Sequence, residues 1–539
     1  NAKPALVAQR ACEVLRTMEP QQKVDCEALD MFTSAAVQRR AFEPNEGIAP
    51  HAARRVLREM RDANAAADPA KKGKDKEASV RTTLRAPLQR FALDTLQRHL
   101  RELRDRHVED GALVVLDNAT GEVLAWVGSS GPLSQAAEVD GVTALRQPGS
   151  TLKPLLYGQA IAERRITAAS LIEDSSAQIS TASGLYIPQN YDRRFKGPVS
   201  ARTALAASLN VPAVRTLVMV SPEAFARELR AAGLPLRESG DYYGYSLALG
   251  SAEVSLLSLT NAYRMLANGG RYGTTTLTAR PTPTAPTAAD KARAAEPPLL
   301  DPRAAFIVGD ILSDPNARTR TFGLDSILST RFWTAVKTGT SKDMRDNWAV
   351  GWSQRYTVGV WVGNASGASM WDVSGTSGAA PVWAEVMRFL HAREPSRAPA
   401  PPAGVVQAHV EFGPGADGGP LEAARDEWFL QGTEQPLFAL DTGMAGSAAS
   451  ARITAPADGT IIAVDPDIPP LRQRVRFESE GRGVQWRIDG KHFARGNSAQ
   501  WLPWPGRHVI ELVDGSGKVV DQRRIEVRGA GVVTKSAKR

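Results

Sequence analysis

The sequence predicts an α+β domain followed by a small all-β sandwich domain. Two apolar runs in GALVVLDNATGEVLAWVG, residues 111–128, flank an Asp-Asn-Ala-Thr-Gly turn and predict a β-hairpin. Helical patterns follow, and strand-like runs rich in Val, Trp and Thr return between residues 332 and 364. Helices between an early hairpin and late strands are typical of one α+β domain whose sheet the late strands complete. From 451 to 528, short runs such as RVRFES and RHVIELVD alternate with Gly, Pro and Asp turns, which predicts a sandwich of about 80 residues.

The remaining elements divide the chain into segments of different composition. Near the N-terminus, VAQRACEVLRTM and HAARRVLREMRDA have helical periodicity, and the charged stretch DPAKKGKDKEAS has none. A further helix is expected in LQRFALDTLQRHLREL, and stretches such as REPSRAPAPPAG indicate an extended connection with limited structure. The expected segments are a helical N-terminal part (1–62), a charged linker (63–79), the α+β domain (80–394), a Pro/Gly-rich connection (395–447), the sandwich (448–529) and a basic tail (530–539).

Composition excludes several classes of function. The 539 residues are 42% hydrophobic and 23% charged, and no apolar run approaches the roughly 18 residues of a membrane span. The net charge of +8, from 66 basic and 58 acidic residues, is spread over a long chain and indicates a solvated basic surface, so no nucleic-acid partner is expected. No Cys/His cluster has metal spacing, and neither a metal nor another cofactor is expected. Cys12 and Cys26 fit a disulfide and two core thiols equally well.

Three short motifs occur in chain order: Ser150-Thr-Leu-Lys153, Ser208-Leu-Asn210 and the run KTGTS that begins at Lys337. Each one occurs by chance in many proteins. Their joint occurrence, in this order and in compatible local structure, favours a serine enzyme of the type that penicillins acylate. Competing nucleophiles fit less well, because no G-x-S-x-G elbow accompanies a suitable His and the seven His residues are in contexts typical of surface or packing positions.

The chemistry of acyl transfer explains why these residue types are needed. Ser150 and Lys153 share one face of a helix, and a desolvated Lys153 is a base for the Ser150 hydroxyl once its pKa falls from about 10.4 toward neutrality. Lys337 is a second cation that would lower that pKa further. The hydroxyl of Ser208 can relay a proton, and the amide of Asn210 can hold the substrate backbone.

The KTGTS run supplies the expected substrate-binding residues. Gly339 allows the substrate to approach the backbone, and the hydroxyls of Thr338 and Thr340 can bind a carboxylate. The N–H of Thr340 can form an oxyanion hole with that of Ser150. The expected catalytic residues are therefore Ser150, Lys153, Ser208, Asn210 and Lys337, and the expected substrate-binding residues are Thr338, Gly339, Thr340 and Ser341.

Residues 80–390 resemble the transpeptidase domain of class A penicillin-binding proteins, through RQPGSTLKP, PQNYD, SLNVPAVR, LALGSAEVSLLSLTNAYRMLANGG and KTGTSKDMRDNWAVGW. The module at 451–528, with VQWRIDG and WLPWPGRHVIELVD, resembles the C-terminal domain of the 1C-type members. The resemblance implies the penicillin-recognising serine acyl-transferase fold shared by β-lactamases and transpeptidases. It also implies D,D-transpeptidation of peptidoglycan stem peptides, acylation by β-lactams, and a periplasmic location on the inner membrane.

Class A members begin with a membrane anchor and a glycosyltransferase domain. Residues 1–62 look like the tail of that domain, and its acidic catalytic motifs are not found in this sequence. The expectation is that the chain is a fragment of a bifunctional gene product and does not itself polymerise lipid-linked disaccharide.

Other functions remain open from the sequence alone. Water as the acceptor would make the site a D,D-carboxypeptidase, and a domain that binds penicillin or glycan without turnover would be a scaffold. A β-lactamase would need a deacylating carboxylate, and none is assignable after Asn210. The module at 448–529 is expected to be non-catalytic and to bind cell-wall or divisome-type partners. Its Trp486, Trp501 and Trp504 fit core positions better than an exposed platform, although the Pro-Gly turn near the last two favours their exposure.

Overall fold

The N-terminal segment contains the helices α1 (Pro4–Met18) and α3 (Pro50–Ala67). A disulfide joins Cys12 to Cys26, with their Cα atoms 5.6 Å apart, which decides between the two alternatives for these cysteines. The helix α3 runs to Ala67, five residues beyond the expected end of the segment at 62, and its Ala52 and Val56 are buried in the core of the following domain.

The computed structural model describes residues 4–18, 24–29, 47–67, 79–177, 179–181, 184–279, 297–323, 326–415, 418–440, 451–456, 459–463, 474–480, 484–515 and 517–528.

The main domain, residues 80–394, is built on an antiparallel sheet in the order β2-β1-β9-β8-β7. The strands are β1 (Asp110–Asp117), β2 (Val123–Val127), β7 (Ala335–Thr340), β8 (Asp346–Trp352) and β9 (Tyr356–Gly363). The predicted hairpin is present: the Thr120 N–H donates to Asp117 Oδ1 at 2.9 Å, and Gly121 has a φ of +73°. The late strands complete the sheet as expected, because β9 pairs with β1 over the whole of both strands.

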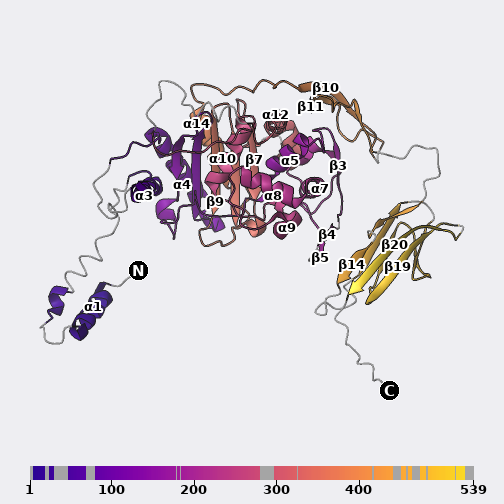
Figure 1. The fold of residues 1–539 in the computed structure, drawn as a ribbon, viewed down its shortest axis with the longest axis horizontal. Helices are drawn as coiled ribbons and strands as arrows, with labels where there is room; N and C mark the ends of the chain where they lie inside the picture. The colour runs from indigo at the N-terminus through magenta and orange to yellow at the C-terminus, as the bar shows by residue number, and fades with distance from the viewer. Residues whose placement is uncertain are drawn as a thin grey trace, which may run out of the picture.

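Helices cover both faces of this sheet (Figure 1). On one face lie α4 (Ala86–Glu102) and α14 (Ala379–Leu390), and on the other lie α5 (Lys153–Ala162), α10 (Leu256–Ala267) and α12 (Pro302–Ser313). Because both faces are covered, β2, β8 and β9 are buried throughout, which explains why their sequences do not alternate between apolar and polar residues.

Shorter elements complete the main domain. Several helices begin at capping side chains; Ser200, for example, accepts a hydrogen bond from the N–H of Thr203 at the start of α6. The remaining elements are α6 (Ala201–Ala206), α7 (Asn210–Val220), α8 (Pro222–Ala231), α9 (Gly240–Tyr243), α13 (Pro315–Phe322), η2 (Arg104–Arg106), η3 (Gly131–Leu133), η4 (Gly149–Leu152), η5 (Gly244–Leu249), η6 (Lys342–Met344) and the strand pairs β3 (Leu171–Asp174) with β6 (Gly197–Ser200) and β4 (Ile179–Thr181) with β5 (Gly184–Tyr186).

The expectation of limited structure between 395 and 447 is wrong for much of that segment. It contains β10 (Val405–Phe412), β11 (Arg425–Leu430) and β12 (Leu437–Phe438), which form a sheet in the order β11-β10-β12, called here the connecting sheet. Apolar side chains of this sheet pack on Ala169 of the main domain, and Phe429 is fully buried. The strands here are short because Pro and Gly interrupt them. Four apolar side chains of the sheet nevertheless form a small core: Val410, Phe412, Phe429 and Phe438.

The C-terminal module is the predicted β-sandwich, with the sheets β13-β15-β18 and β14-β20-β19-β16-β17 packed around one core. Trp486 and Trp501 are buried in that core, whereas the side chain of Trp504 is 50% exposed. The preference for core positions is thus confirmed for two of the three tryptophans. The strands are β13 (Arg452–Ala455), β14 (Thr460–Ala463), β15 (Val475–Glu480), β16 (Gln485–Ile488), β17 (Lys491–Arg495), β18 (Ser498–Trp501), β19 (Gly506–Val513) and β20 (Val519–Arg528).

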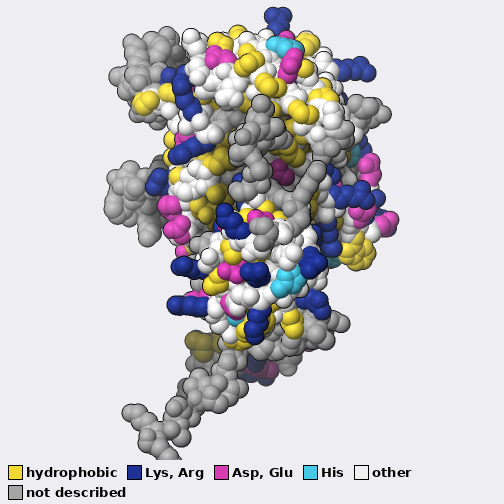
Figure 2. All heavy atoms as spheres, turned by 90° about the vertical axis from the view of Figure 1, so that its right-hand side faces the viewer, with side chains coloured by type: hydrophobic (Ala, Val, Ile, Leu, Met, Phe, Trp, Pro, Cys, Tyr) yellow, Lys and Arg dark blue, Asp and Glu magenta, His cyan; other side chains and the backbone are white. Residues whose placement is uncertain are grey.

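The surface carries charges of both signs. Figure 2 shows Lys and Arg side chains spread over one face of the molecule among acidic and uncharged ones. Among the helices of the described residues, none combines the length and the apolar character that a membrane crossing requires.

Candidate active site

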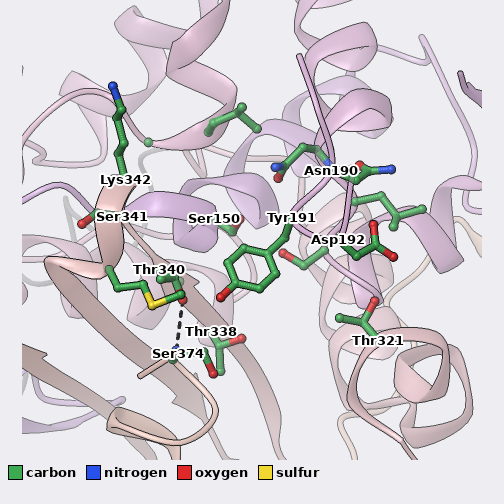
Figure 3. Close-up of a pocket in the computed structure, with 18 of the residues that line it drawn as sticks. Ser150, Asn190, Tyr191, Asp192, Thr321, Thr338, Thr340, Ser341, Lys342 and Ser374 are labelled. Carbon is green, nitrogen blue, oxygen red and sulfur yellow. Dashed lines mark hydrogen bonds between the residues drawn. The ribbon is translucent and has the colours of Figure 1, made fainter. Parts of the chain in front are cut away.

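A pocket with a volume of about 800 Å³ lies at the edge of the central sheet, between β7, η4 and the start of α7 (Figure 3). It brings together residues that are far apart in the sequence. Seven of the nine predicted site residues line it, and the side chains of the other two, Lys153 and Lys337, are buried behind its wall. The seven are Ser150, Ser208, Asn210, Thr338, Gly339, Thr340 and Ser341.

Three glycines allow the segment that carries Ser150 to lie directly against β7. A Cβ atom on Gly339 would come within 2.4 Å of the carbonyl oxygen of Pro148, and one on Gly149 within 2.6 Å of that of Thr340. The backbone of Gly250 also packs against Gly149, because a Cβ atom on Gly250 would lie 2.2 Å from the Gly149 carbonyl oxygen. Gly149 and Gly250 also have positive φ values, +56° and +79°. These close backbone approaches fix the position of Ser150 relative to β7.

Lys153 is fully buried at the start of α5, and three hydrogen-bond acceptors surround its Nζ. Its Nζ lies 2.8 Å from the Ser208 carbonyl oxygen, 3.1 Å from that of Leu209 and 2.8 Å from Asn210 Oδ1. Burial lowers the pKa of Lys153 well below its ordinary value, and the nearby charge of Lys337 lowers it further. Both causes were predicted from the sequence, and desolvation is the larger of the two.

Ser208 lies in the turn between α6 and α7 with a φ of +61°, in the left-handed region that side chains rarely adopt. Its hydroxyl accepts a hydrogen bond from Lys337 Nζ at 2.7 Å, and the same ammonium group donates to the Thr338 carbonyl oxygen at 2.8 Å. Burial, with a contribution from the charge of Arg318, lowers the pKa of Lys337 to about 7. Ser208 therefore lies between the two lysines, with its carbonyl oxygen on Lys153 and its hydroxyl on Lys337.

Asn210 is held by the protein on both sides of its amide. Its Oδ1 accepts from Lys153, and its Nδ2 donates to the Gln189 carbonyl oxygen at 2.8 Å. One N–H and one lone pair of the amide remain for a ligand. Its main structural role is thus to position Lys153, which sequence reasoning did not anticipate.

The edge strand β7 presents its backbone to the pocket. The Ser341 N–H donates to the Asp346 carbonyl oxygen at 2.9 Å, so the alternation of an antiparallel ladder turns the N–H and C=O groups of Thr338 and Thr340 away from β8, toward the open edge. The Thr340 hydroxyl accepts from the Gly375 N–H at 3.0 Å (Figure 3). The Ser341 hydroxyl donates to Asp346 Oδ2 at 2.9 Å, so it orders the end of β7 as well as lining the pocket.

Sequence reasoning missed several residues of the pocket wall. Within PQNYD, quoted above only for the resemblance, Asn190 accepts from the N–H of Asn210 at 2.8 Å and donates to Asp174. A polar motif without a periodic pattern was the only available signal for these side chains. The further wall residues are Gln147, Asn190, Tyr191, Asp192, Lys196, Ala207, Leu209, Ser246, Leu249, Gly250, Ser251, Thr321, Lys342, Asp343, Met344, Ser374, Gly375 and Thr376.

Known proteins share this arrangement of sequence and fold. Residues 111–388 match the family model described as penicillin binding protein transpeptidase domain, and residues 442–526 match the penicillin-binding protein C-terminus family. The chain is 34% identical to penicillin-binding protein 1C of Escherichia coli (strain K12) over 376 residues, which cover 68% of this chain and 46% of that protein. It is 31% identical to penicillin-binding protein 2D of Bacillus subtilis (strain 168) over 366 residues, 66% of this chain and 51% of that one. The chain thus spans about half of the length of these two relatives.

Solved structures show the same fold at lower identity. Penicillin-binding protein 1A from Haemophilus influenzae superimposes with a TM-score of 0.58 at 19% identity, over 79% of this chain and 82% of that one. The PonA1 protein from Mycobacterium tuberculosis in complex with penicillin V gives a TM-score of 0.52 at 20% identity, over 65% of this chain and 95% of that one. The transpeptidase model covers more than half of the chain. The chain therefore belongs to the penicillin-binding proteins with a transpeptidase domain.

Proposed function

We propose that this chain is a peptidoglycan D,D-transpeptidase that cross-links stem peptides through an acyl-enzyme on Ser150, and that β-lactams acylate the same serine. The observation that carries the proposal is the placement of Ser150 and Ser208 on the wall of an open pocket, with two buried lysines behind that wall. A surface lysine near a serine has no such effect, because burial is the main cause that lowers the pKa of the amine toward neutrality.

In the first step the Ser150 Oγ attacks the carbonyl carbon of the penultimate D-Ala of a donor peptide, and its proton passes to the neutral amine of Lys153. The three acceptors around Lys153 Nζ stabilise the ammonium that forms. The oxyanion of the tetrahedral intermediate lies toward the outward-facing N–H of Thr340 and the N–H of Ser150.

The carbon–nitrogen bond then breaks, and the leaving amine of D-Ala takes a proton from the Ser208 hydroxyl, which Lys337 reprotonates across their 2.7 Å hydrogen bond. In the second step the amine of an acceptor peptide attacks the ester, and the same groups act in reverse order. The carboxylate of the donor binds at the hydroxyls of Thr338 and Thr340. Lys337, buried behind the wall, acts on Ser208 rather than on that carboxylate.

Fluorescent penicillin tests the nucleophile. Ser150→Ala should lose covalent labelling entirely, because it removes one oxygen atom from a half-buried position, and Lys153→Ala should lose it as well. Ser366→Ala, at an exposed turn outside the pocket, is the matched control and should label like the parent chain. A Ser150→Ala protein that melts like the parent chain and still carries the label would contradict the assignment.

The acceptor is tested with a D-Ala-D-Ala donor peptide and an acceptor amine. A cross-linked product is expected. Release of D-Ala without that product would assign a D,D-carboxypeptidase instead, and labelling without either product would assign a penicillin-binding scaffold.

The proposal includes the setting of the complete gene product. The resemblance of residues 1–62 to the end of a glycosyltransferase domain supports a bifunctional enzyme that is anchored to the inner membrane and works in the periplasm. Glycan synthesis from lipid II by the complete gene product tests this part, independently of the acylation of Ser150.

A further inference from the structure

Asp174, the last residue of β3, is a buried acidic side chain that no step above uses. None of its surface is exposed, and it is not part of the pocket wall. Asn190 Nδ2 donates to both of its oxygens at 2.8 Å, and the N–H of Lys196 donates to Oδ2 at 2.8 Å. Both oxygens thus act as acceptors, as those of an ionised carboxylate do, and Asp174 places a negative charge in the core.

A buried charge is unfavourable unless an opposite charge lies close to it. In the described part of the chain, no basic side chain forms a direct ion pair with Asp174. Its charge nevertheless acts on Lys153. Burial and the charge of Lys337 lower the pKa of Lys153, and the charge of Asp174 works in the opposite direction.

A chain of hydrogen bonds fixes Asp174 relative to Lys153. Asn190 donates to Asp174 through its Nδ2 and accepts from the N–H of Asn210 through its Oδ1, at 2.8 Å in each case. The side chain of Asn210 then accepts from Lys153 Nζ, also at 2.8 Å. Two asparagines therefore connect the carboxylate to the lysine, and both are held by the backbone of neighbouring segments.

The other titratable side chains near this pair are neutral or have partners of their own. Burial raises the pKa of Tyr157, which lies one turn after Lys153 on α5, so its phenol is neutral. The basic side chains each donate to another side chain: Lys337 on β7 to Ser208, Arg215 on α7 to Ser175, and Lys196 to Asp192. The charge of Asp174 is therefore available to Lys153.

We propose that Asp174 is a positioning residue for acyl transfer, whose buried charge stabilises the Lys153 ammonium that forms when Ser150 gives up its proton. This inference rests on the proposed function, in which the neutral amine of Lys153 takes that proton. Without an opposite charge the buried ammonium would be costly, and Lys153 would be a weak base. Asp174 acts through Lys153 and does not contact the substrate.

The pH profile of acylation tests this role. Asp174→Asn removes the charge and keeps the size of the side chain. Second-order rate constants for acylation by benzylpenicillin are measured for the parent chain and this variant, over the whole pH range in which both stay folded. The acid limb of the profile follows the release of the proton from Lys153, and the alkaline limb follows its release from Lys337.

In Asp174→Asn the acid limb should move to lower pH and the alkaline limb should stay in place. The rate constant between the two limbs should fall about tenfold, because Lys153 becomes a weaker base. Glu173→Gln is the matched control, since it removes an exposed carboxylate from the preceding position of the same strand. It should keep both limbs and the parent rate.

An acid limb that stays in place in Asp174→Asn, with or without a loss of rate, would overturn the inference, because a merely structural role does not move the limb. Melting temperatures are measured alongside. If Asp174→Asn does not fold, Asp174→Ser replaces it, since the Ser hydroxyl can still accept from Asn190. Unfolding of both variants would also overturn the inference, by assigning Asp174 a structural role. If benzylpenicillin acylates the parent chain at no pH, the proposed function itself fails.

Discussion

At the scale of single residues, the two lysines show how burial creates reactivity. Lys153 and Lys337 have 0% and 2% of their surface exposed, and both have lowered pKa values for which burial is the larger cause. A buried ammonium group is unfavourable, and the hydrogen bonds to carbonyl oxygens and to Ser208 offset only part of that cost. The two lysines therefore lower the stability of the folded chain, while their lowered pKa values provide the amine that acyl transfer needs.

The destabilising effect of burying Lys337 should be measurable as a difference between the parent chain and Lys337→Met in how the free energy of unfolding depends on pH. The folded pKa of about 7 lies below the ordinary value of 10.5, so between these pH values the unfolded chain binds a proton that the folded chain has released. The free energy of unfolding of the parent chain should therefore rise by about 2 kcal/mol more than that of Lys337→Met between pH 7 and pH 9. Lys153 is present in both proteins, so the larger part of its own shift, which comes from burial, cancels in the comparison, and only the smaller part that comes from the charge of Lys337 does not.

Urea unfolding at both pH values measures this difference, and acylation by benzylpenicillin is measured on the same samples. Lys337→Met should be the more stable protein at pH 6.5 and should acylate far more slowly. Equal pH dependence of stability in the two proteins would show that the Lys337 pKa is not lowered in the fold.

At the scale of elements, the connecting sheet is tied to the helix that leads to Ser208. Glu422 accepts from the N–H of Ser200 at 2.8 Å and from its hydroxyl at 2.7 Å, at the start of α6. Glu427, fully buried on β11, accepts from Arg202 Nε at 2.8 Å. Burial alone would raise the pKa of Glu427, but the hydrogen bond and charge of Arg202 outweigh it and lower that pKa. Both glutamates therefore contact the first residues of a short helix whose other end carries the serine.

Glu427→Ala should destabilise the main domain by about 3–5 kcal/mol, since it leaves the buried guanidinium of Arg202 without its most buried partner. Asp426→Ala is the matched control on the same strand: that carboxylate is 65% exposed and pairs with His409, so its loss should cost less than about 1 kcal/mol. Denaturant unfolding measures both. Similar small losses in the two variants would mean that the connecting sheet does not support the main domain.

At the scale of the whole molecule, the C-terminal module lies outside the catalytic pocket. Its strand β14 lies beside β5 of the main domain (Figure 1), yet among the described residues the pocket wall contains none from 451–528. The module has its own core around Trp486, Phe477 and Ile510, so it does not depend on the main domain for burial of apolar surface.

Deletion of residues 448–539 should therefore leave the acylation rate of Ser150 within about twofold, a change that corresponds to less than about 0.5 kcal/mol. It should alter association with cell-wall material or protein partners, which a pull-down with purified peptidoglycan measures. If the truncated chain melts like the parent main domain but no longer acylates, the module contributes to the active site through its neighbour β5.

The sequence by itself determined the elements whose causes are local. The turn at Asp117–Gly121, the apolar strands of the central sheet and the β-sandwich follow from turn chemistry and periodicity over a few residues. The three motifs also identified side chains that the fold brings to one place, because the residue types needed for acyl transfer can be read from short patterns.

The tertiary structure alone decided how those side chains are used. The pKa values of Lys153 and Lys337 depend on burial by helices and strands far away in the sequence, which no local pattern contains. The engagement of Asn210 with Lys153, the exposure of Tyr191 in the pocket and the order of the connecting sheet likewise arise from contacts between distant segments. Desolvation and close packing are properties of the assembled core, so they become visible only once the chain has folded.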